Sequence, residues 1–129
     1  NTSEHVNDGL KLNNAFITAA LKCVPPEDKP EKKELMNCFN FFQNEIYLLK
    51  KLKIIVALGK VAFDTCLEFY KKYYNFDKKY KFMHGKVYSL PKGIQLIGCY
   101  HPSPRNVNTG RINEKKMTNL FLKIQNKVN

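Results

Sequence analysis

Residues 53–64, KIIVALGKVAFD, predict a buried strand that turns through one glycine into a helix. The first half, residues 53–58, is almost continuously apolar, as in a parallel strand that is covered on both faces of its sheet. After Gly59 the apolar side chains recur at helical spacing, which predicts one buried face. The members of that face are Val61, Ala62, Cys66, Phe69 and Tyr73. A strand and a helix joined in this way indicate an α/β domain.

Two further strands are expected on either side of this unit. Residues 15–21 (AFITAAL) form an apolar run with β-branched side chains that stops before a pair of prolines, so they predict a buried strand. Residues 94–100 predict another strand on the same grounds. Between the first two strands, Pro30 is suited to begin a helix that continues to about Leu52. The expected buried face of that helix comprises Leu35, Phe39, Phe42, Ile46 and Leu49.

The rest of the chain adds a connection and a final helix. Residues 75–86 are basic and aromatic, and they predict a loop with a turn at His84-Gly85. Asn113 is suited to cap a helix whose expected buried side chains are Met117, Leu120, Phe121 and Ile124. We therefore expect an α/β fold, a three-layer α/β/α arrangement with a mainly parallel central sheet, formed by residues 1–129 as a single domain.

The chain carries a large excess of positive charge. Its 22 Lys and Arg against 11 Asp and Glu give a formal net charge of +11. Such an excess favours nucleic acid or another anionic surface as the partner, although a solvated lysine-rich surface explains it as well. The lysines of residues 71–81, interleaved with aromatic side chains, leave the same two interpretations open. The hydrophobic content of 43% argues against a disordered chain.

The N-terminal residues are polar, and no apolar run approaches the ~20 residues needed to span a bilayer. We therefore expect no signal peptide, no membrane contact and a cytoplasmic setting. In that setting the four cysteines are expected to be thiols or metal ligands rather than disulfides. The first residue is Asn1 instead of methionine, which indicates a processed chain or a fragment.

Residues 98–111, GCYHPSPRNVNTGR, carry the densest functional signal. The strand expected at 94–100 delivers a stiff, basic loop to the surface, because each proline restricts both itself and the residue before it. In open α/β sheets, ligands bind beyond the carboxyl ends of the strands. The loop at 23–30, the turn at Gly59 and the loop at 101–110 all follow expected strands. We therefore expect them to share one edge of the sheet.

Several of these motifs together resemble the uracil-DNA glycosylase superfamily, and in particular its type-5, iron–sulfur branch. They occur in the order CVPPEDKP (23–30), Asn37-Cys38, IIVALGKVAFD (54–64) and YHPSPRNVNTGR (100–111), and the similarity runs from Asp8 to Phe121. The resemblance implies a prokaryotic, nucleoid-associated enzyme of DNA repair. It would flip uracil or another deaminated base out of DNA and hydrolyse the bond from that base to its sugar.

The resemblance also assigns roles to the loop that begins at residue 101. His101 matches the histidine that donates a hydrogen bond to the departing base, where negative charge develops. Asn106 is implied to contact the base or to position water. The loop residues implied to press on the DNA backbone are Pro102, Ser103 and Pro104. A surface histidine without a function is the alternative interpretation of His101.

Four further residues are implied to contact DNA or the base. Arg105 falls where relatives place a side chain that wedges into the duplex, although a phosphate contact explains it equally well. Arg111 is expected to bind DNA. Ala19 indicates a permissive base pocket. Asp28 stands where relatives commonly carry asparagine, and an ionised aspartate can only accept hydrogen bonds from a base.

Cys23 and Cys38 match two of the four ligands of a [4Fe–4S] cluster in the iron–sulfur branches. The relatives carry the other two cysteines, with the first catalytic motif, in an upstream segment, so this chain corresponds to their C-terminal part. Cys66 and Cys99 fall on expected core positions, where cysteine acts as a small hydrophobe.

We expect a monomer that binds DNA, and a sliding clamp is a second candidate partner. The competing hypothesis is a non-catalytic module that binds DNA or damage and keeps the fold without the chemistry.

Overall fold

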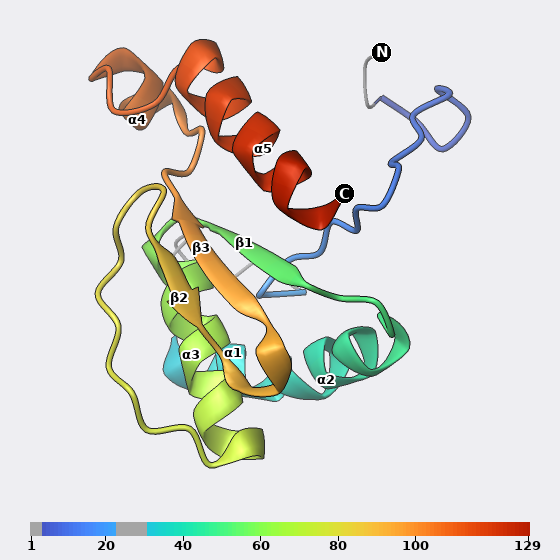
Figure 1. The fold of residues 1–129 in the computed structure, drawn as a ribbon, viewed down its shortest axis with the longest axis vertical. Helices are drawn as coiled ribbons and strands as arrows, with labels where there is room; N and C mark the ends of the chain where they lie inside the picture. Colours follow the sequence, from blue (N-terminus) through green and yellow to red (C-terminus); the bar gives the residue numbers. More distant parts are fainter. Residues whose placement is uncertain (1–3, 23–30) are drawn as a thin grey trace.

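The computed structural model describes residues 4–22 and 31–129. Two short helices come first, and a small sheet with three further helices follows (Figure 1). The elements are α1 (Lys32–Asn37), α2 (Phe39–Leu48), β1 (Ile54–Leu58), α3 (Lys60–Tyr74), β2 (Val87–Ser89), the 3-10 turn Pro91–Gly93, β3 (Gln95–Cys99), α4 (Pro104–Asn108) and α5 (Glu114–Val128). Within these residues, no helix has the length and apolar character needed to cross a membrane.

The described sheet has the strand order β1-β3-β2. β1 and β3 are parallel, with Ile54 opposite Gln95 and Leu58 opposite Cys99. β2 pairs with the other side of β3 in the antiparallel direction. The expected α/β fold is confirmed, and the sheet is mixed because β2 adds an antiparallel neighbour. The sequence did not predict β2, since a strand of only three residues is too short to show an alternating pattern.

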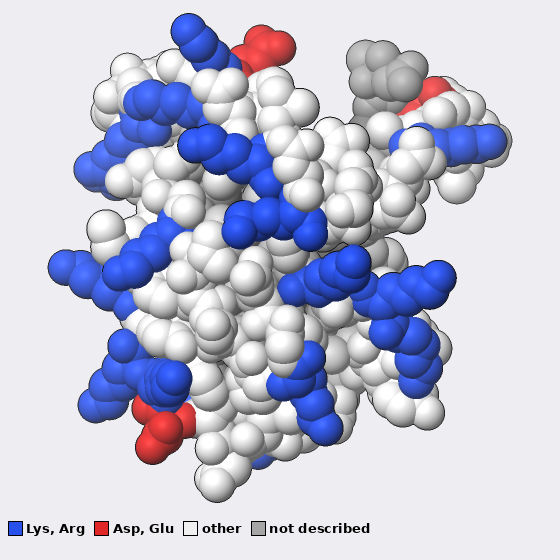
Figure 2. Space-filling model, viewed as in Figure 1, with Lys and Arg blue, Asp and Glu red and all other residues white. Residues whose placement is uncertain are grey.

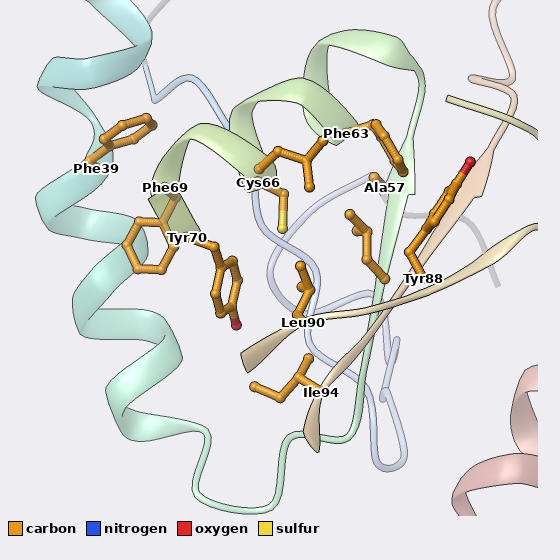
Figure 3. Packing of buried hydrophobic residues seen from close by; sticks show 11 residues of the cluster. Phe39, Ala57, Phe63, Cys66, Phe69, Tyr70, Tyr88, Leu90 and Ile94 are labelled. Carbon is orange, nitrogen blue, oxygen red and sulfur yellow. The ribbon is translucent and has the colours of Figure 1, made fainter. Parts of the chain in front are cut away.

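Helices cover the sheet on both faces, and each face has its own apolar cluster. One cluster joins α2, α3 and the sheet, and Figure 3 shows its rings packed between them. The other joins α5 and the sheet. Leu96 belongs to the first cluster and Ile97 to the second, because successive side chains of a strand point to opposite faces. The layered arrangement therefore follows from the apolar character of both faces of β3.

Phe69 lies at the centre of the aromatic part of the first cluster. Its ring is fully buried, 4.7 Å from the ring of Phe42 and 6.0 Å from that of Phe39, both measured between centroids. On the same helix, the ring of Tyr70 lies 5.4 Å from that of Phe69. Edge-to-face contacts of this kind add to the stabilisation that comes from burial alone. The helix face predicted from Ala62, Cys66, Phe69 and Tyr73 therefore packs against α2 and the sheet.

The strand expected at residues 15–21 is wrong. In the described part of the chain these residues form no strand, and the side chains of Phe16 and Ile17 are 56% and 73% exposed. The segment lies against α2 instead. The Nζ of Lys22 forms an ion pair with Glu45 at 2.8 Å, and the Thr18 hydroxyl donates a hydrogen bond to the same carboxylate at 2.8 Å. An apolar run has the composition of a strand, but only a neighbouring strand can supply its hydrogen bonds.

The single helix expected from Pro30 to Leu52 is two helices. They join at Cys38, which ends α1 and begins α2, and the second helix ends at Leu48. Glu31 precedes α1, and its N–H donates to the Glu34 carboxylate at 2.8 Å, which satisfies a donor that the helix leaves open. Of the predicted buried face, Phe39 is buried, and Phe42 and Ile46 are partly buried against the first cluster.

Two side chains that were expected to be buried are exposed. Val61 is 52% exposed in the first turn of α3, and Phe121 is 41% exposed on α5. The other members of their helix faces turn inward as predicted. A stripe of apolar residues on a helix is wider than its contact with the sheet, so residues at its margin remain in solvent.

Candidate active site

The carboxyl ends of β1 and β3 meet at one edge of the sheet, as their parallel direction requires. Leu58 and Cys99 are partners at this edge, and the N–H of Gly59 donates to the Cys99 carbonyl at 2.7 Å. The chain continues from β3 into α4 and the beginning of α5, which lie beyond this edge (Figure 1). The predicted convergence of the Gly59 turn with the loop at 101–110 is therefore confirmed. The loop at 23–30 lies outside the described residues.

Gly59 and His101 lie close together at this edge. The backbone of Gly59 has φ of +94°, a region that favours glycine. A Cβ atom placed on Gly59 would lie 3.2 Å from the Cβ of His101. Glycine therefore serves two purposes here. It allows the turn from β1 into α3, and it leaves room for the histidine.

His101 is held by its main chain, and its side chain is exposed. Its carbonyl accepts a hydrogen bond from the N–H of Ser103 at 2.8 Å and another from the Nδ2 of Asn106, also at 2.8 Å. No hydrogen bond to the imidazole occurs within the described residues. A histidine with a fixed backbone and an open ring can present that ring to a bound molecule.

Residues 104–108, expected as loop, form the short helix α4. Ser103 caps it, with its Oγ accepting from the N–H of Asn106 at 3.4 Å, and Pro104 occupies the first turn. The hydroxyl of Thr109 donates to the Arg105 carbonyl at 2.8 Å near the other end. Serine followed by proline is a recognised beginning of a helix, so the sequence did contain this signal. The sequence predicted a stiff loop, and in the structure Pro104 begins a helix inside it.

Asn106 braces the loop at two points. Its side-chain Nδ2 donates to the His101 carbonyl, and its own carbonyl accepts the N–H of Ile112 at 3.3 Å. Ile112 is almost completely buried under α5, so this second bond ties the exposed loop to the core. The structure thus brings Asn106 beside His101. Among the residues that the structure describes, none donates a hydrogen bond to the Oδ1 of Asn106.

The arginines of this region lie in solvent, on a strongly basic surface. Arg105 and Arg111 are both exposed, as are Pro102 and Pro104. Lys116 of α5 reaches back to the loop, where its Nζ donates to the carbonyls of Gly110 at 2.7 Å and Arg111 at 3.4 Å. Figure 2 shows Lys and Arg spread over this face of the molecule, with few acidic side chains between them. The surface therefore suits a polyanion.

The expected pocket residues are not brought to the loop by any described contact. Ala19 is exposed on the segment that lies against α2, because Thr18 and Lys22 on either side of it both contact Glu45. Asp28 lies outside the described residues. The structure therefore unites His101, Asn106 and the proline-rich loop.

Cys38 is buried at the junction of α1 and α2, and the N–H of Lys22 donates to its Sγ at 3.5 Å. This contact brings the residue before Cys23 next to Cys38, although Cys23 itself lies outside the described residues.

Cys66 and Cys99 lie in the clusters on opposite faces of the sheet, as expected for core positions. Burial raises the pKa of the Cys66 thiol to about 12 and also raises that of Cys99. Such thiols are poor ligands and nucleophiles. Within the described residues, no three acidic, histidine or cysteine side chains lie together so that they could hold a metal ion.

One side chain near the site was not predicted from the sequence. His84 was expected only as part of a turn, yet its ring stacks on the ring of Tyr100, the residue before His101. An isolated pairing between His84 and Gly98 brings it there, and a bridge of one residue has no pattern in the sequence.

Sequence similarity identifies the class of protein to which this fold and this sheet edge belong. The family model of the uracil DNA glycosylase superfamily matches residues 3–125, and the chain belongs to that superfamily.

Curated relatives are more specific. The chain is 35% identical over 118 residues to the type-5 uracil-DNA glycosylase of Thermus thermophilus, across 91% of this chain and 50% of that protein. It is 36% identical over 115 residues to the type-5 enzyme of Mycobacterium leprae, across 88% of this chain and 49% of the relative. Similarity to the type-4 enzyme of Archaeoglobus fulgidus is lower, at 27% over 99 residues, across 74% of this chain and 48% of the relative. The chain spans about half the length of these relatives. The predicted resemblance, including the type-5 branch, is confirmed.

Proposed function

We propose that this protein is a DNA-repair glycosylase that removes uracil, and other deaminated bases, from DNA. One observation carries the proposal. The exposed imidazole of His101 stands at the carboxyl edge of the sheet on a backbone held by Ser103 and Asn106. The relatives named uracil-DNA glycosylases support the same reaction. Residues 1–129 would supply one domain of the enzyme.

His101 would act on the leaving base. When the bond between base and sugar breaks, the sugar becomes cationic and negative charge collects on the O2 atom of the pyrimidine. A neutral imidazole that donates a hydrogen bond to O2 stabilises the transition state more than the ground state. Loss of one such donor costs about 10²–10³ in rate. Asn106 would keep His101 in place through the carbonyl contact and offer its Oδ1 to the base or to water.

The rest of the loop would bind the DNA itself. Pro102, Ser103 and Pro104 would press on the backbone of the damaged strand, and Arg111 would contact phosphate. Arg105 would either fill the space that the flipped base leaves or bind phosphate. Flipping costs a few kcal/mol, and least at mismatches such as U·G, which contributes to selectivity.

The pocket and the cofactor complete the proposal. Ala19 and Asp28 would border the base. Cys23 and Cys38 would be two of the four thiolate ligands of a [4Fe–4S] cluster. The Lys22–Cys38 contact supports this, since amide hydrogen bonds to sulfur are a feature of such sites. The other two ligands would not be Cys66 and Cys99, which are buried on opposite faces of the sheet. The cluster would tie the segment before α1 to α2.

Iron and sulfide analysis of the full-length protein tests the proposed cluster. We expect both iron and sulfide to be lost in Cys38→Ser but retained in Cys66→Ser.

The setting would be the cytoplasm, with the protein acting on the nucleoid as a monomer. The positive charge and the exposed basic loop support DNA as the partner. Contact with a sliding clamp would be a further partnership.

The test is single-turnover release of uracil from a U·G duplex by the full-length protein. His101→Ala should slow release about 10²–10³-fold, while salt-dependent DNA affinity stays nearly unchanged. His5→Ala is the matched control, because His5 is also exposed but belongs to the N-terminal segment. If His101→Ala releases uracil at the wild-type rate, the proposed role of His101 is wrong. DNA binding without any release by the wild-type protein would identify a binding module instead.

A further inference from the structure

We propose that His84 is a positioning residue for this reaction, because its side chain holds the main chain of Tyr100 and thereby sets where His101 stands. The effect on catalysis depends on the proposed role of His101. The contact itself is a property of the fold and can be tested separately.

Two contacts join His84 to Tyr100. The N–H of Tyr100 donates a hydrogen bond to the Nδ1 atom of His84 at 3.1 Å. The two rings are stacked, with their centroids 5.1 Å apart and an angle of 6° between their planes. β3 ends at Cys99. At the next residue, Tyr100, the imidazole of His84 accepts the main-chain hydrogen bond that a neighbouring strand accepts within a sheet. Tyr100 is bonded directly to His101, and a shift of its backbone would therefore move the catalytic ring.

The segment that carries His84 is itself closely attached to β3. His84 is bridged to Gly98, and the N–H of Gly85 donates to the Gly98 carbonyl at 2.7 Å. A Cβ atom on Gly98 would lie only 2.7 Å from the Met83 carbonyl oxygen, so this close approach requires glycine in β3. The ring of Phe82 packs edge-on against that of Tyr100, at 5.9 Å between centroids. His84 is thus held firmly enough to position another residue.

The hydrogen bond requires neutral His84. An Nδ1 atom that accepts a hydrogen bond carries no proton, so the proton of the neutral ring is on Nε2. Two titratable groups face this ring. Tyr100 faces it from the end of β3, and the ammonium group of Lys116 faces it from α5. Neither group is a carboxylate, the kind of neighbour that favours the imidazolium. Burial first, and then the charge of Lys116, lower the pKa of His84.

Acid should therefore weaken the contact. When pH falls below the ordinary histidine pKa of about 6.5 and reaches the lower pKa of folded His84, Nδ1 gains a proton and two donors face each other. The imidazolium would also repel Lys116, which holds the carbonyls of Gly110 and Arg111 in the same loop. Release of the Tyr100 N–H and loosening of the loop should occur together.

A pair of substitutions in the full-length protein separates the two contacts. His84→Phe keeps a ring to stack on Tyr100 but removes the acceptor. His84→Asn removes the ring but places an amide oxygen close to the position of Nδ1. We expect His84→Phe to slow single-turnover uracil release about ten- to hundredfold with DNA affinity retained, as when a catalytic group is slightly misplaced. His84→Asn should stay within about threefold of wild type and should lose the part of the acid limb that His84 causes.

Hydrogen exchange at the Tyr100 amide gives a readout that does not depend on activity. Exchange should be faster in His84→Phe than in the wild type or His84→Asn. In the wild-type protein, the protection of this amide should decrease on acidification through the pKa of His84. The wild-type titration needs no substitution, so it remains decisive if a variant fails to fold.

The outcomes are distinct. An unprotected Tyr100 amide in the wild type, or equal protection in both variants, would overturn the hydrogen bond. Equal rates in His84→Phe and the wild type would overturn the positioning role. If the wild type releases no uracil while Tyr100 responds as expected, the proposed function fails and the contact stands, without a catalytic role for His84.

Discussion

The aromatic core beneath the sheet and the loop at 101–111 are held in opposite ways. In the core, Phe63, Phe69 and Tyr70 are fully buried and pack ring against ring. In the loop every residue is exposed or half-buried, and hydrogen bonds to main-chain atoms hold its shape. Burial of apolar surface supplies most of the favourable free energy of folding, whereas hydrogen bonds fix the relative positions of the groups they join. We therefore expect substitutions in the core to change stability, and substitutions in the loop to change the rate per folded molecule.

The two regions are joined at a few places. Ile112 is buried under α5 and donates its N–H to Asn106 in the loop. Gly59 caps the core helix α3 and lies close to His101. Substitutions at such junctions should affect both the stability of the fold and the rate of the reaction. They therefore show how independent the core and the loop are of each other.

The largest expected effect on stability is in the core. Phe69→Ala should lower the free energy of unfolding by about 3–5 kcal/mol, because it removes a fully buried ring that contacts α2. Chemical denaturation measures the change, and the rate of uracil release per folded molecule should stay close to wild type. Phe41→Ala is the matched control, since Phe41 is 59% exposed on α2. A large loss of rate in folded Phe69→Ala would show that the core and the loop are coupled.

An intermediate effect is expected at the junction. Gly59→Ala should cost about 1–3 kcal/mol through its backbone conformation and should also slow uracil release, because the new methyl group would press on the Cβ of His101. Gly93→Ala separates the two causes. Gly93 has φ of +71°, but open space surrounds the place of its Cβ. Thermal unfolding should shift in both variants, and equal rates in the two would mean that the contact with His101 has no catalytic consequence.

The smallest effect is expected at the cap of α4. Ser103→Ala removes the acceptor for the Asn106 N–H, and a lost cap typically costs ~1 kcal/mol. The bond is long, at 3.4 Å, so global stability should change little. Faster hydrogen exchange at the Asn106 amide is the expected signal, and Ser103→Thr should restore slow exchange. Unchanged exchange in Ser103→Ala would mean that the prolines alone hold the loop.

The parts of the fold that were predicted well are those with long local patterns. The strands expected at 53–58 and 94–100 formed as β1 and β3, since burial on both faces leaves a continuous apolar run. The helix after Gly59 formed as α3, since its apolar side chains recur at helical spacing. The same reasoning placed a strand at 15–21, which was wrong because pairing depends on a neighbour that composition does not specify. Cys38 divides a helix whose apolar spacing continues across it, so the periodicity could not reveal the break.

The sequence by itself determined that the chain is an α/β protein with an excess of basic residues, and it singled out the loop that we propose carries the chemistry. His101, Asn106 and the prolines between them are neighbours in the chain, so their association needed no fold to be recognised. Only the tertiary structure decided that Gly59 leaves no room for a side chain beside His101 and that His84 binds Tyr100. Both contacts arise because β3 brings distant segments to its end, and strand pairing depends on the arrangement of the whole sheet.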